Sequence, residues 1–88
     1  MDRHRPGYRH AYRSICRSIE LKLVRRHREE YIERLAVHRA QTTPRPRRAS
    51  PDYQAWYDHC RMLSVRDLVA AHADEVDDLW GQRAHLLP

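Results

Sequence analysis

The chain has 88 residues, with 17 Lys and Arg against 12 Asp and Glu, so its formal net charge is +5. A chain of this length forms at most one domain, whose core supplies only about 3–5 kcal/mol of stability. No run approaches the roughly 18 apolar residues of a membrane span, and no apolar block follows the basic N-terminus as a signal peptide requires. With 2 Gly and no Asn, turn residues are too scarce for a series of hairpins. We therefore expect a small, basic, all-α protein of two to four helices in the cytoplasm.

The charge is divided unevenly along the chain. Residues 1–50 carry 14 basic and 5 acidic side chains, a net charge of +9, whereas residues 51–88 carry 3 and 7, a net charge of −4. Lys22 is the only lysine. The other basic groups are guanidinium groups, whose forked geometry suits phosphate and carboxylate.

The two halves also share a sequence pattern. A shift of 45 positions aligns seven identical pairs: Pro6/Pro51, Tyr8/Tyr53, Tyr12/Tyr57, Leu23/Leu68, Val24/Val69, His27/His72 and Glu30/Glu75. Self-similarity at a fixed offset indicates a repeated helical unit. Convergence of two amphipathic helices with similar caps gives the same pattern, and both explanations stay open.

In chain order, residues 1–6 are predicted to be a flexible basic arm and residues 7–41 a basic helical unit. Within this unit Tyr8, Tyr12 and Ile15 begin an apolar stripe at helical spacing that Ile19 and Leu23 continue. A second stripe, formed by Val24, Tyr31 and Leu35, is rotated by more than a quarter turn. This predicts a short aromatic helix and then a longer amphipathic one, broken near Ser18, or else one bent helix over residues 8–40.

Residues 42–50 are predicted to be a semi-rigid linker, because Pro44 and Pro46 exclude a regular helix. Ser50-Pro51-Asp52 then provides a capping serine, a first-turn proline and an acid for the next helix. Residues 51–88 form the acidic helical unit, and Ser64-Val-Arg-Asp67 resembles a capping box that starts a new helix inside it. We expect the aromatic side chains of both units to face inward: Tyr8, Tyr12, Tyr53, Trp56 and Tyr57.

The sequence predicts no enzyme, no metal site and no cofactor. It holds seven histidines, but no Cys-x-x-Cys or His-x-x-x-His spacing, no glycine-rich phosphate loop and no nucleophile elbow. His27 and His72 lie beside apolar positions, which is typical of a histidine at the edge of a core with one nitrogen hydrogen-bonded. Cys16 and Cys60 are expected to be two reduced, half-buried thiols.

The basic half predicts contacts with nucleic-acid phosphates. On a helix Arg9, Arg13 and Arg17 lie at i, i+4 and i+8 and form one cationic ridge. Arginine adds bidentate geometry to the electrostatic attraction of phosphates. The predicted nucleic-acid-binding residues are Arg9, Arg13, Arg17, Lys22, Arg25, Arg26, Arg28, Arg45, Arg47 and Arg48. No major-groove recognition helix is evident, so we expect weak sequence preference for DNA or RNA.

The repeat bears on this prediction. At the offset of 45, Arg9, Arg13 and Arg17 correspond to Gln54, Asp58 and Met62. The fold therefore does not require these arginines, which favours a ligand over a structural role. The acidic unit is predicted to contact a protein partner or a second copy in a homodimer through Asp74, Glu75, Asp77, Asp78 and Trp80.

Two alternatives to nucleic acid remain. In the first, the protein is an adaptor or inhibitor whose basic half docks on an acidic protein surface. In the second, it is a structural subunit that self-associates because its oppositely charged ends attract.

Leu23-Val-Arg-Arg-His27-Arg-Glu-Glu30-Tyr31 and its echo Leu68-Val-Ala-Ala-His72-Ala-Asp-Glu75-Val76 resemble a pattern in short, arginine-rich proteins of actinobacteria and their phages. The resemblance covers about nine residues in each half. It implies a bacterial or phage-infected cell and no particular activity, and it extends the adaptor alternative to phage proteins directed at host machinery. Similar strings often carry proline after the histidine, where this chain has Arg28 and Ala73.

Overall fold

The computed structural model describes residues 7–88, so the predicted arm over residues 1–6 lies outside the described residues. It contains four α-helices, α1 (Tyr8–Arg26), α2 (Arg28–Gln41), α3 (Tyr53–Ala71) and α4 (Ala73–Arg83), and a short 3-10 turn, η1 (Ala84–Leu86). There is no strand in this part of the chain, and the prediction of an all-α fold with two to four helices is confirmed. None of the described helices is both long and apolar enough to cross a membrane.

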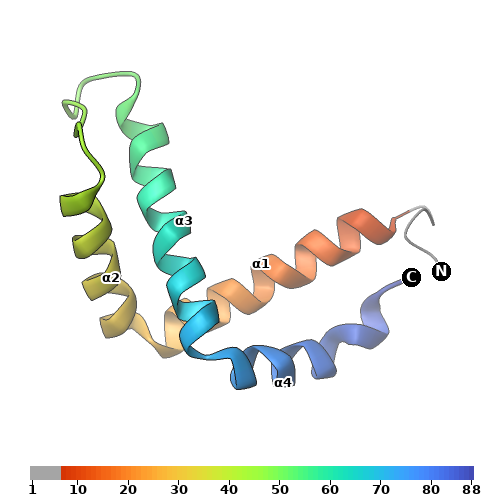
Figure 1. Ribbon diagram of the computed structural model, residues 1–88. Coiled ribbons are helices and arrows are strands. Elements are labelled where there is room, and N and C mark those ends of the chain that lie inside the picture. Colours follow the sequence, from red (N-terminus) through yellow and green to blue (C-terminus); the bar gives the residue numbers. More distant parts are fainter. Residues whose placement is uncertain (1–6) are drawn as a thin grey trace.

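The four helices form a V with two arms (Figure 1). In one arm α2 lies along α3, and in the other α4 lies along α1. The chain passes from one arm to the other at two breaks, between α1 and α2 and between α3 and α4, and both breaks lie at the vertex of the V. Each half of the chain therefore supplies one helix to each arm.

The offset of 45 residues in the sequence is repeated in the helix bounds. α1 and α3 begin at Tyr8 and Tyr53, and each runs for 19 residues. Each ends at a histidine with nearly the same backbone, φ −118° and ψ 44° at His27 and φ −120° and ψ 42° at His72. Each half of the chain thus has the same helix–break–helix arrangement, with the break at a histidine.

The predicted breaks near Ser18 and at Ser64-Val-Arg-Asp67 are wrong, and the alternative of one bent helix over residues 8–40 is interrupted at His27. α1 runs through Ser18 without interruption, and α3 runs through residues 64–67, so the first helix of each half is the longer one. Ser64 does not cap a helix, because it lies on the buried stripe of α3 and its hydroxyl donates to the Cys60 carbonyl at 2.8 Å. The apolar stripe of each first helix continues to Leu23 or Leu68, and the chain turns only after it.

The arm of α1 and α4 has an apolar interior. Ile15, Ile19 and Leu23 of α1 are buried with Leu79 of α4, and partly buried apolar side chains pack around them: Val69, Val76, Trp80 and Leu87. Tyr12 contacts the Trp80 ring, with 5.1 Å between centroids, but remains 46% exposed. The expectation that every aromatic stripe residue faces inward is therefore confirmed for Trp56 and wrong for Tyr12.

The arm of α2 and α3 is held by more polar contacts. The indole of buried Trp56 donates to the Thr42 carbonyl at 2.9 Å, and His38 Nε2 lies 2.6 Å from an Asp67 oxygen. The non-helical segment 42–52 closes the tip of this arm, and Ser50 there accepts a hydrogen bond from the Asp52 amide at 3.1 Å. The prediction that Ser50 caps the next helix and Pro51 lies in its first turn is wrong, because Asp52 is the N-cap of α3, no described side chain caps this end, and Ser50 and Pro51 lie in the preceding turn.

Candidate nucleic-acid interface

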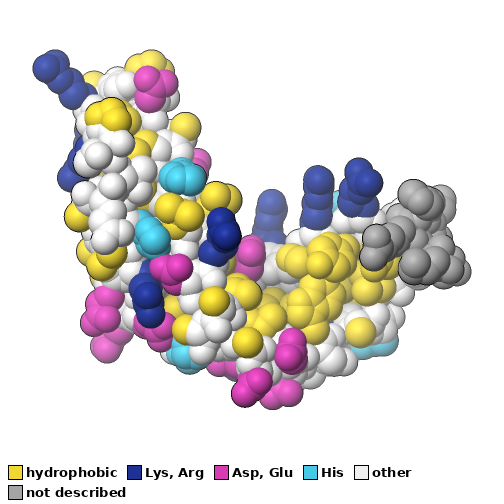
Figure 2. Space-filling model, viewed as in Figure 1, with side chains coloured by type: hydrophobic (Ala, Val, Ile, Leu, Met, Phe, Trp, Pro, Cys, Tyr) yellow, Lys and Arg dark blue, Asp and Glu magenta, His cyan; other side chains and the backbone are white. Residues whose placement is uncertain are grey.

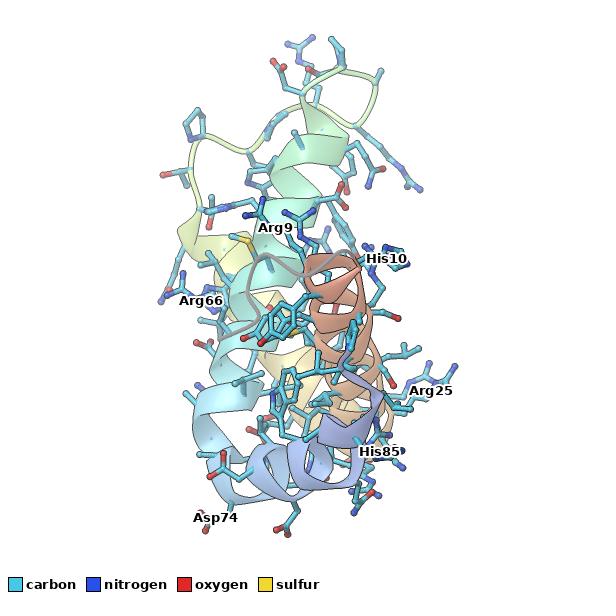
Figure 3. The ribbon with its side chains drawn as sticks, turned by 90° about the vertical axis from the view of Figure 1, so that its right-hand side faces the viewer. Arg9, His10, Arg25, Arg66, Asp74 and His85 are labelled. Atoms are coloured by element: carbon cyan, nitrogen blue, oxygen red, sulfur yellow. The ribbon has the colours of Figure 1, made fainter. Side chains whose placement is uncertain are left out.

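Three arginines form a ridge on α1 that faces the angle of the V. Arg9, Arg13 and Arg17, here called the inner ridge, are all exposed, and about 12 Å of helix separates the first from the last. Figure 2 shows Lys and Arg side chains standing along the upper side of α1, and Figure 3 shows Arg9 there. Among the ion pairs of residues 7–88, none involves a member of the inner ridge.

The inner ridge leads into a hollow between α1 and α3. Arg17 lines one side of this hollow, and Arg61 and Arg66 of α3 line the other. Apolar side chains also line it: Leu21, Val24, Met62 and Val65. Two acids, Glu20 and Asp58, belong to the same lining, so the three arginines leave it with one excess positive charge. Arg61 has a weak partner in Asp58 at 3.8 Å, with both side chains 55% exposed. The V thus brings three arginines from the acidic and basic halves together at one concave place.

The other basic residues predicted to bind nucleic acid lie elsewhere. Arg25 is about 160° around α1 from Arg9 at 100° per residue, and Figure 3 shows the two pointing to different sides. Lys22, Arg25 and Arg26 line a second depression with Arg83, and Arg26 is paired with Glu75 at 2.7 Å. Arg28 begins α2 and is exposed.

The linker arginines lie at the tip of the other arm (Figure 1). Arg47 and Arg48 are exposed, whereas the Arg45 guanidinium lies 5.4 Å from the centroid of the Trp56 ring. This distance is within the range of a cation–π contact. The ten predicted residues therefore form separate groups, and the inner ridge is the group that shares a concave surface with arginines of the second half.

The acidic residues predicted to bind a protein divide into two sets. Asp74, Asp77 and Asp78 are exposed on α4, and Figure 3 shows Asp74 at the lower end of the view, well below Arg9. Glu75 and Trp80 instead make contacts within the chain, Glu75 with Arg26 and His27 and Trp80 with Tyr12. The exposed aspartates therefore make one side of α4 negative, and this side faces away from the inner ridge (Figure 2).

The two break histidines meet at the vertex. Their rings stack with 3.7 Å between centroids and 12° between planes. His27 Nε2 lies 2.8 Å from a Glu75 oxygen, and His72 Nε2 lies 2.9 Å from a Glu30 oxygen. Since Glu30 and Glu75 are also 45 residues apart, each half provides the carboxylate for the histidine of the other half. This confirms the expectation that each histidine lies at the edge of the core with one nitrogen hydrogen-bonded.

Two pKa shifts describe the chemistry of these regions. The Arg26 guanidinium, and to a lesser extent His27, hold the pKa of Glu75 below its ordinary value of 4.5. Burial raises the pKa of the Cys16 thiol, which therefore lacks the lowered pKa of a nucleophilic cysteine. Cys16 and Cys60 are both free thiols.

Sequence reasoning found the inner ridge from its spacing but missed Arg61 and Arg66, which lie in the half with net negative charge. Their approach to Arg17 depends on how α3 packs against α1, and no spacing in the sequence indicates that packing. Comparison of the chain with protein-family models, with curated proteins and with solved structures finds no match.

Proposed function

We propose that this protein binds nucleic acid through phosphate contacts made by the inner ridge and by Arg61 and Arg66. The observation that carries the proposal is an exposed row of three arginines, without ion pairs among the described residues, that leads into a hollow bearing further arginines. Guanidinium groups in such a row attract a phosphate backbone by charge and by release of counterions. A concave surface lets cations of both arms approach the same backbone.

The comparison of α1 with α3 supports a ligand-binding role for the inner ridge. The two helices have the same length, the same terminal break and nearly the same backbone at that break. At the positions of Arg9, Arg13 and Arg17, α3 carries Gln54, Asp58 and Met62. Because α3 forms the same helix without arginine at these positions, the arginines are free to serve a partner.

Weak sequence preference follows from the kind of contact. Arginines that meet phosphates fix the position of a protein on a strand but do not read the bases. Base readout in the major groove requires side chains that reach base edges from an inserted helix or strand. The inner ridge lies on one face of a helix whose opposite side is packed on α4, so we assign it to the backbone and not to base edges.

The experiment is a salt titration of binding to duplex DNA and to RNA, followed by fluorescence anisotropy. We expect the logarithm of the affinity to fall steeply and linearly with the logarithm of the salt concentration. The variant Arg9→Gln/Arg13→Gln/Arg17→Gln should bind at least about tenfold more weakly at ~100 mM salt, with a duplex-DNA slope reduced in magnitude by about 3.

The linker supplies a matched control. The variant Arg45→Gln/Arg47→Gln/Arg48→Gln removes the same charge from the tip of the other arm, and its affinity should change less than threefold, with little change in slope. Equal losses in the two variants would mean that total charge alone attracts the nucleic acid. Absence of binding by the unmodified chain at low salt would overturn the proposal.

An acidic protein segment is the second candidate for the same hollow. The observation in its favour is the exposure of Leu21 and Met62, at 49% and 50%, between the arginines of the two helices. Apolar side chains framed by cations suit an acidic amphipathic helix. Leu21→Ser/Met62→Ser should leave nucleic-acid affinity within about twofold, whereas an interface with such a helix would lose its apolar anchors.

A further inference from the structure

We propose that the vertex of the V is a binding site for a divalent transition-metal ion of the zinc class. Its ligands are one nitrogen from each of His27 and His72 and an oxygen of Glu75. These three ligand atoms all lie within 4.8 Å of one another, and the three residues are partly exposed, so that an ion has access from solvent. Two imidazoles and one carboxylate form a ligand set that zinc uses when it keeps a fourth position for water.

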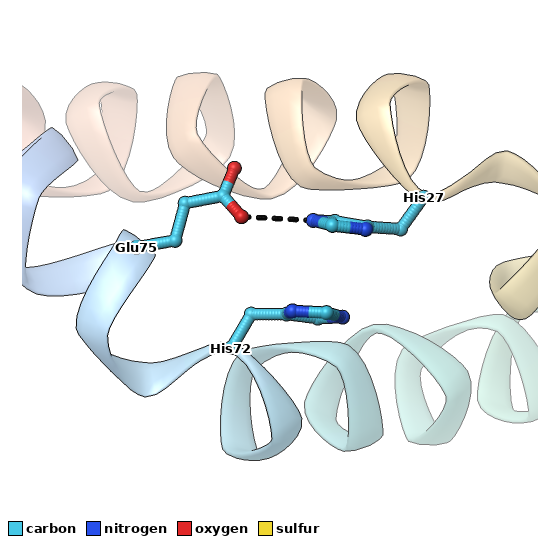
Figure 4. A group of neighbouring side chains, drawn as sticks. All are labelled: His27, His72 and Glu75. Atoms are coloured by element: carbon cyan, nitrogen blue, oxygen red, sulfur yellow. Dashed lines mark hydrogen bonds and ion pairs between the residues drawn. The ribbon is translucent and has the colours of Figure 1, made fainter.

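The polypeptide brings these ligands together from distant parts of the chain. His27 closes α1, whereas His72 and Glu75 flank the beginning of α4. Both histidines sit at helix breaks with nearly the same backbone angles. Figure 4 shows the two rings stacked face to face with the Glu75 carboxylate at one edge of the stack. Because each histidine is held between two helices, an ion has to impose less order on its ligands.

Glu30 orients the His72 ring and fixes its tautomer for binding a metal ion. It lies 2.9 Å from His72 Nε2, a distance at which that nitrogen donates its hydrogen to the carboxylate. The lone pair of neutral His72 then lies on Nδ1, which makes no hydrogen bond among the described residues. A carboxylate behind a metal-bound histidine is the usual arrangement that fixes the tautomer and orients the ring.

Binding requires the side chains at the vertex to rearrange. Ligand atoms around a tetrahedral zinc ion are about 3.3 Å apart, so the cluster has to contract by up to roughly 1.5 Å. The lone pairs of an imidazole lie in the plane of the ring, so one of the two stacked rings has to turn out of the stack. Glu75 keeps a second oxygen for Arg26, at 2.7 Å, while the first leaves His27 for the ion. His27 Nε2 donates its hydrogen to that oxygen in the absence of the ion, so binding requires the other tautomer of His27, with the hydrogen on Nδ1 and the lone pair on Nε2.

The ligand chemistry selects the class of ion. Imidazole nitrogen suits Zn²⁺, Ni²⁺ and Cu²⁺, whereas Mg²⁺ and Ca²⁺ prefer oxygen-only sites. The ion would connect the end of α1 with the beginning of α4 and so fix the two breaks to each other. This inference is independent of the proposed nucleic-acid contact, because the inner ridge contains none of its ligands.

The test is a calorimetric titration of the chelator-treated full chain with Zn²⁺, with Co²⁺ as a spectroscopic probe of coordination. We expect one ion per chain, a rise in the thermal midpoint with Zn²⁺, and the visible bands of a tetrahedral Co²⁺ complex. His27→Gln/His72→Gln should bind at least about 100-fold more weakly. The matched control His59→Gln/His85→Gln, which removes two exposed histidines outside the cluster, should bind like the unmodified chain.

A further variant keeps the proposal testable if the double ligand variant fails to fold. Glu30→Gln leaves all three ligands in place and should weaken Zn²⁺ binding by about 10–100-fold, with the helical circular dichroism signal unchanged. Absence of binding to the unmodified chain would overturn the proposal. Equal affinity of His27→Gln/His72→Gln and the unmodified chain would overturn it as well, since the ion would then bind exposed histidines or thiols.

Discussion

The two arms of the V are built on the same helical frame and hold together by different means. In the arm of α1 and α4, here the apolar arm, Ile15 and Ile19 pack with Leu79. At the matched positions the arm of α2 and α3, here the polar arm, carries Cys60, Ser64 and Arg34, and the Arg34 side chain is 47% exposed. Two arms with the same helical frame thus hold together with different side chains at matched positions.

The polar arm compensates for its smaller apolar content with directed contacts. Trp56 and His38 make hydrogen bonds between α3 and the end of α2, and the Arg39 guanidinium lies 5.5 Å from the centroid of Tyr57. Arg39 also has a cost, because its buried Nε has no hydrogen-bond partner among the described residues. Such contacts depend more on orientation than apolar packing does, and the two arms should therefore respond differently to substitution.

The largest effect is expected from truncation in the apolar arm. Leu79 is buried, so Leu79→Ala should lower the free energy of unfolding by about 2–5 kcal/mol, which is most of the stability of so small a chain. Arg34→Ala at the matched position in the polar arm should change it by less than about 0.5 kcal/mol. Urea unfolding followed by circular dichroism measures both. Similar losses in the two variants would mean that the arms do not differ as described.

A smaller effect is expected when the polar arm loses one hydrogen bond. Trp56→Phe keeps an aromatic ring but leaves the Thr42 carbonyl without its indole donor. The free energy of unfolding should fall by about 1–2 kcal/mol. Thermal unfolding is the measurement, with Trp80→Phe as a control that makes no such hydrogen bond among the described residues. A neutral Trp56→Phe would show that packing alone holds the arm.

Lowering the pH should weaken the contacts of Glu75 at the vertex, where both arms meet. Arg26 first and His27 second lower the pKa of Glu75, so the charged carboxylate is favoured by folding. This stabilisation is present above pH 4.5, the ordinary value, and is lost as the pH falls through the lower pKa of the folded state. The thermal midpoint of the unmodified chain should therefore fall more below pH 4.5 than that of Glu75→Gln. Parallel pH profiles would contradict this expectation.

Only a small effect is expected when the polar arm loses the Ser64 hydroxyl. Its hydroxyl is buried and bonds only to the Cys60 carbonyl of its own helix, so Ser64→Ala removes donor and bond together. The free energy of unfolding should change by less than about 1 kcal/mol. Ile19→Ala at the matched position of the apolar arm should cost several times more. Chemical unfolding of the two variants compares them directly, and a large loss at Ser64 would reveal packing that the hydroxyl alone does not explain.

The helical segments were predictable from the sequence, but the breaks inside each half were not. The apolar spacing of Tyr8 to Leu23 correctly indicates a helix, while neither Ser18 nor Ser64 interrupts one. Both breaks fall at His27 and His72, where no proline or glycine marks them. They arise because the second apolar stripe of each half faces another direction and packs against another helix only if the chain turns. Such a turn depends on how the helices pack, and helix propensity, which is local, does not predict it.

Only the part of the candidate interface that lies on a single helix was predictable from the sequence. Helical spacing alone groups Arg9 with Arg13 and Arg17, because these residues share one element. Arg61 and Arg66 join them only through the crossing of α1 and α3, which an offset in the sequence does not reveal. The same crossing turns Glu75 toward Arg26, although its sequence neighbours Asp74 and Asp77 remain exposed.

The exchange of helices between the arms has a consequence for the integrity of the molecule. Segment 42–52 is a tether between two halves that are already interlocked, since each arm takes one helix from either side of it. A protease cut in this tether would yield two fragments whose apolar faces are complementary to each other, so the nicked protein should remain one particle. Neither fragment could form an arm alone, so we expect the two fragments to fold only when they are together.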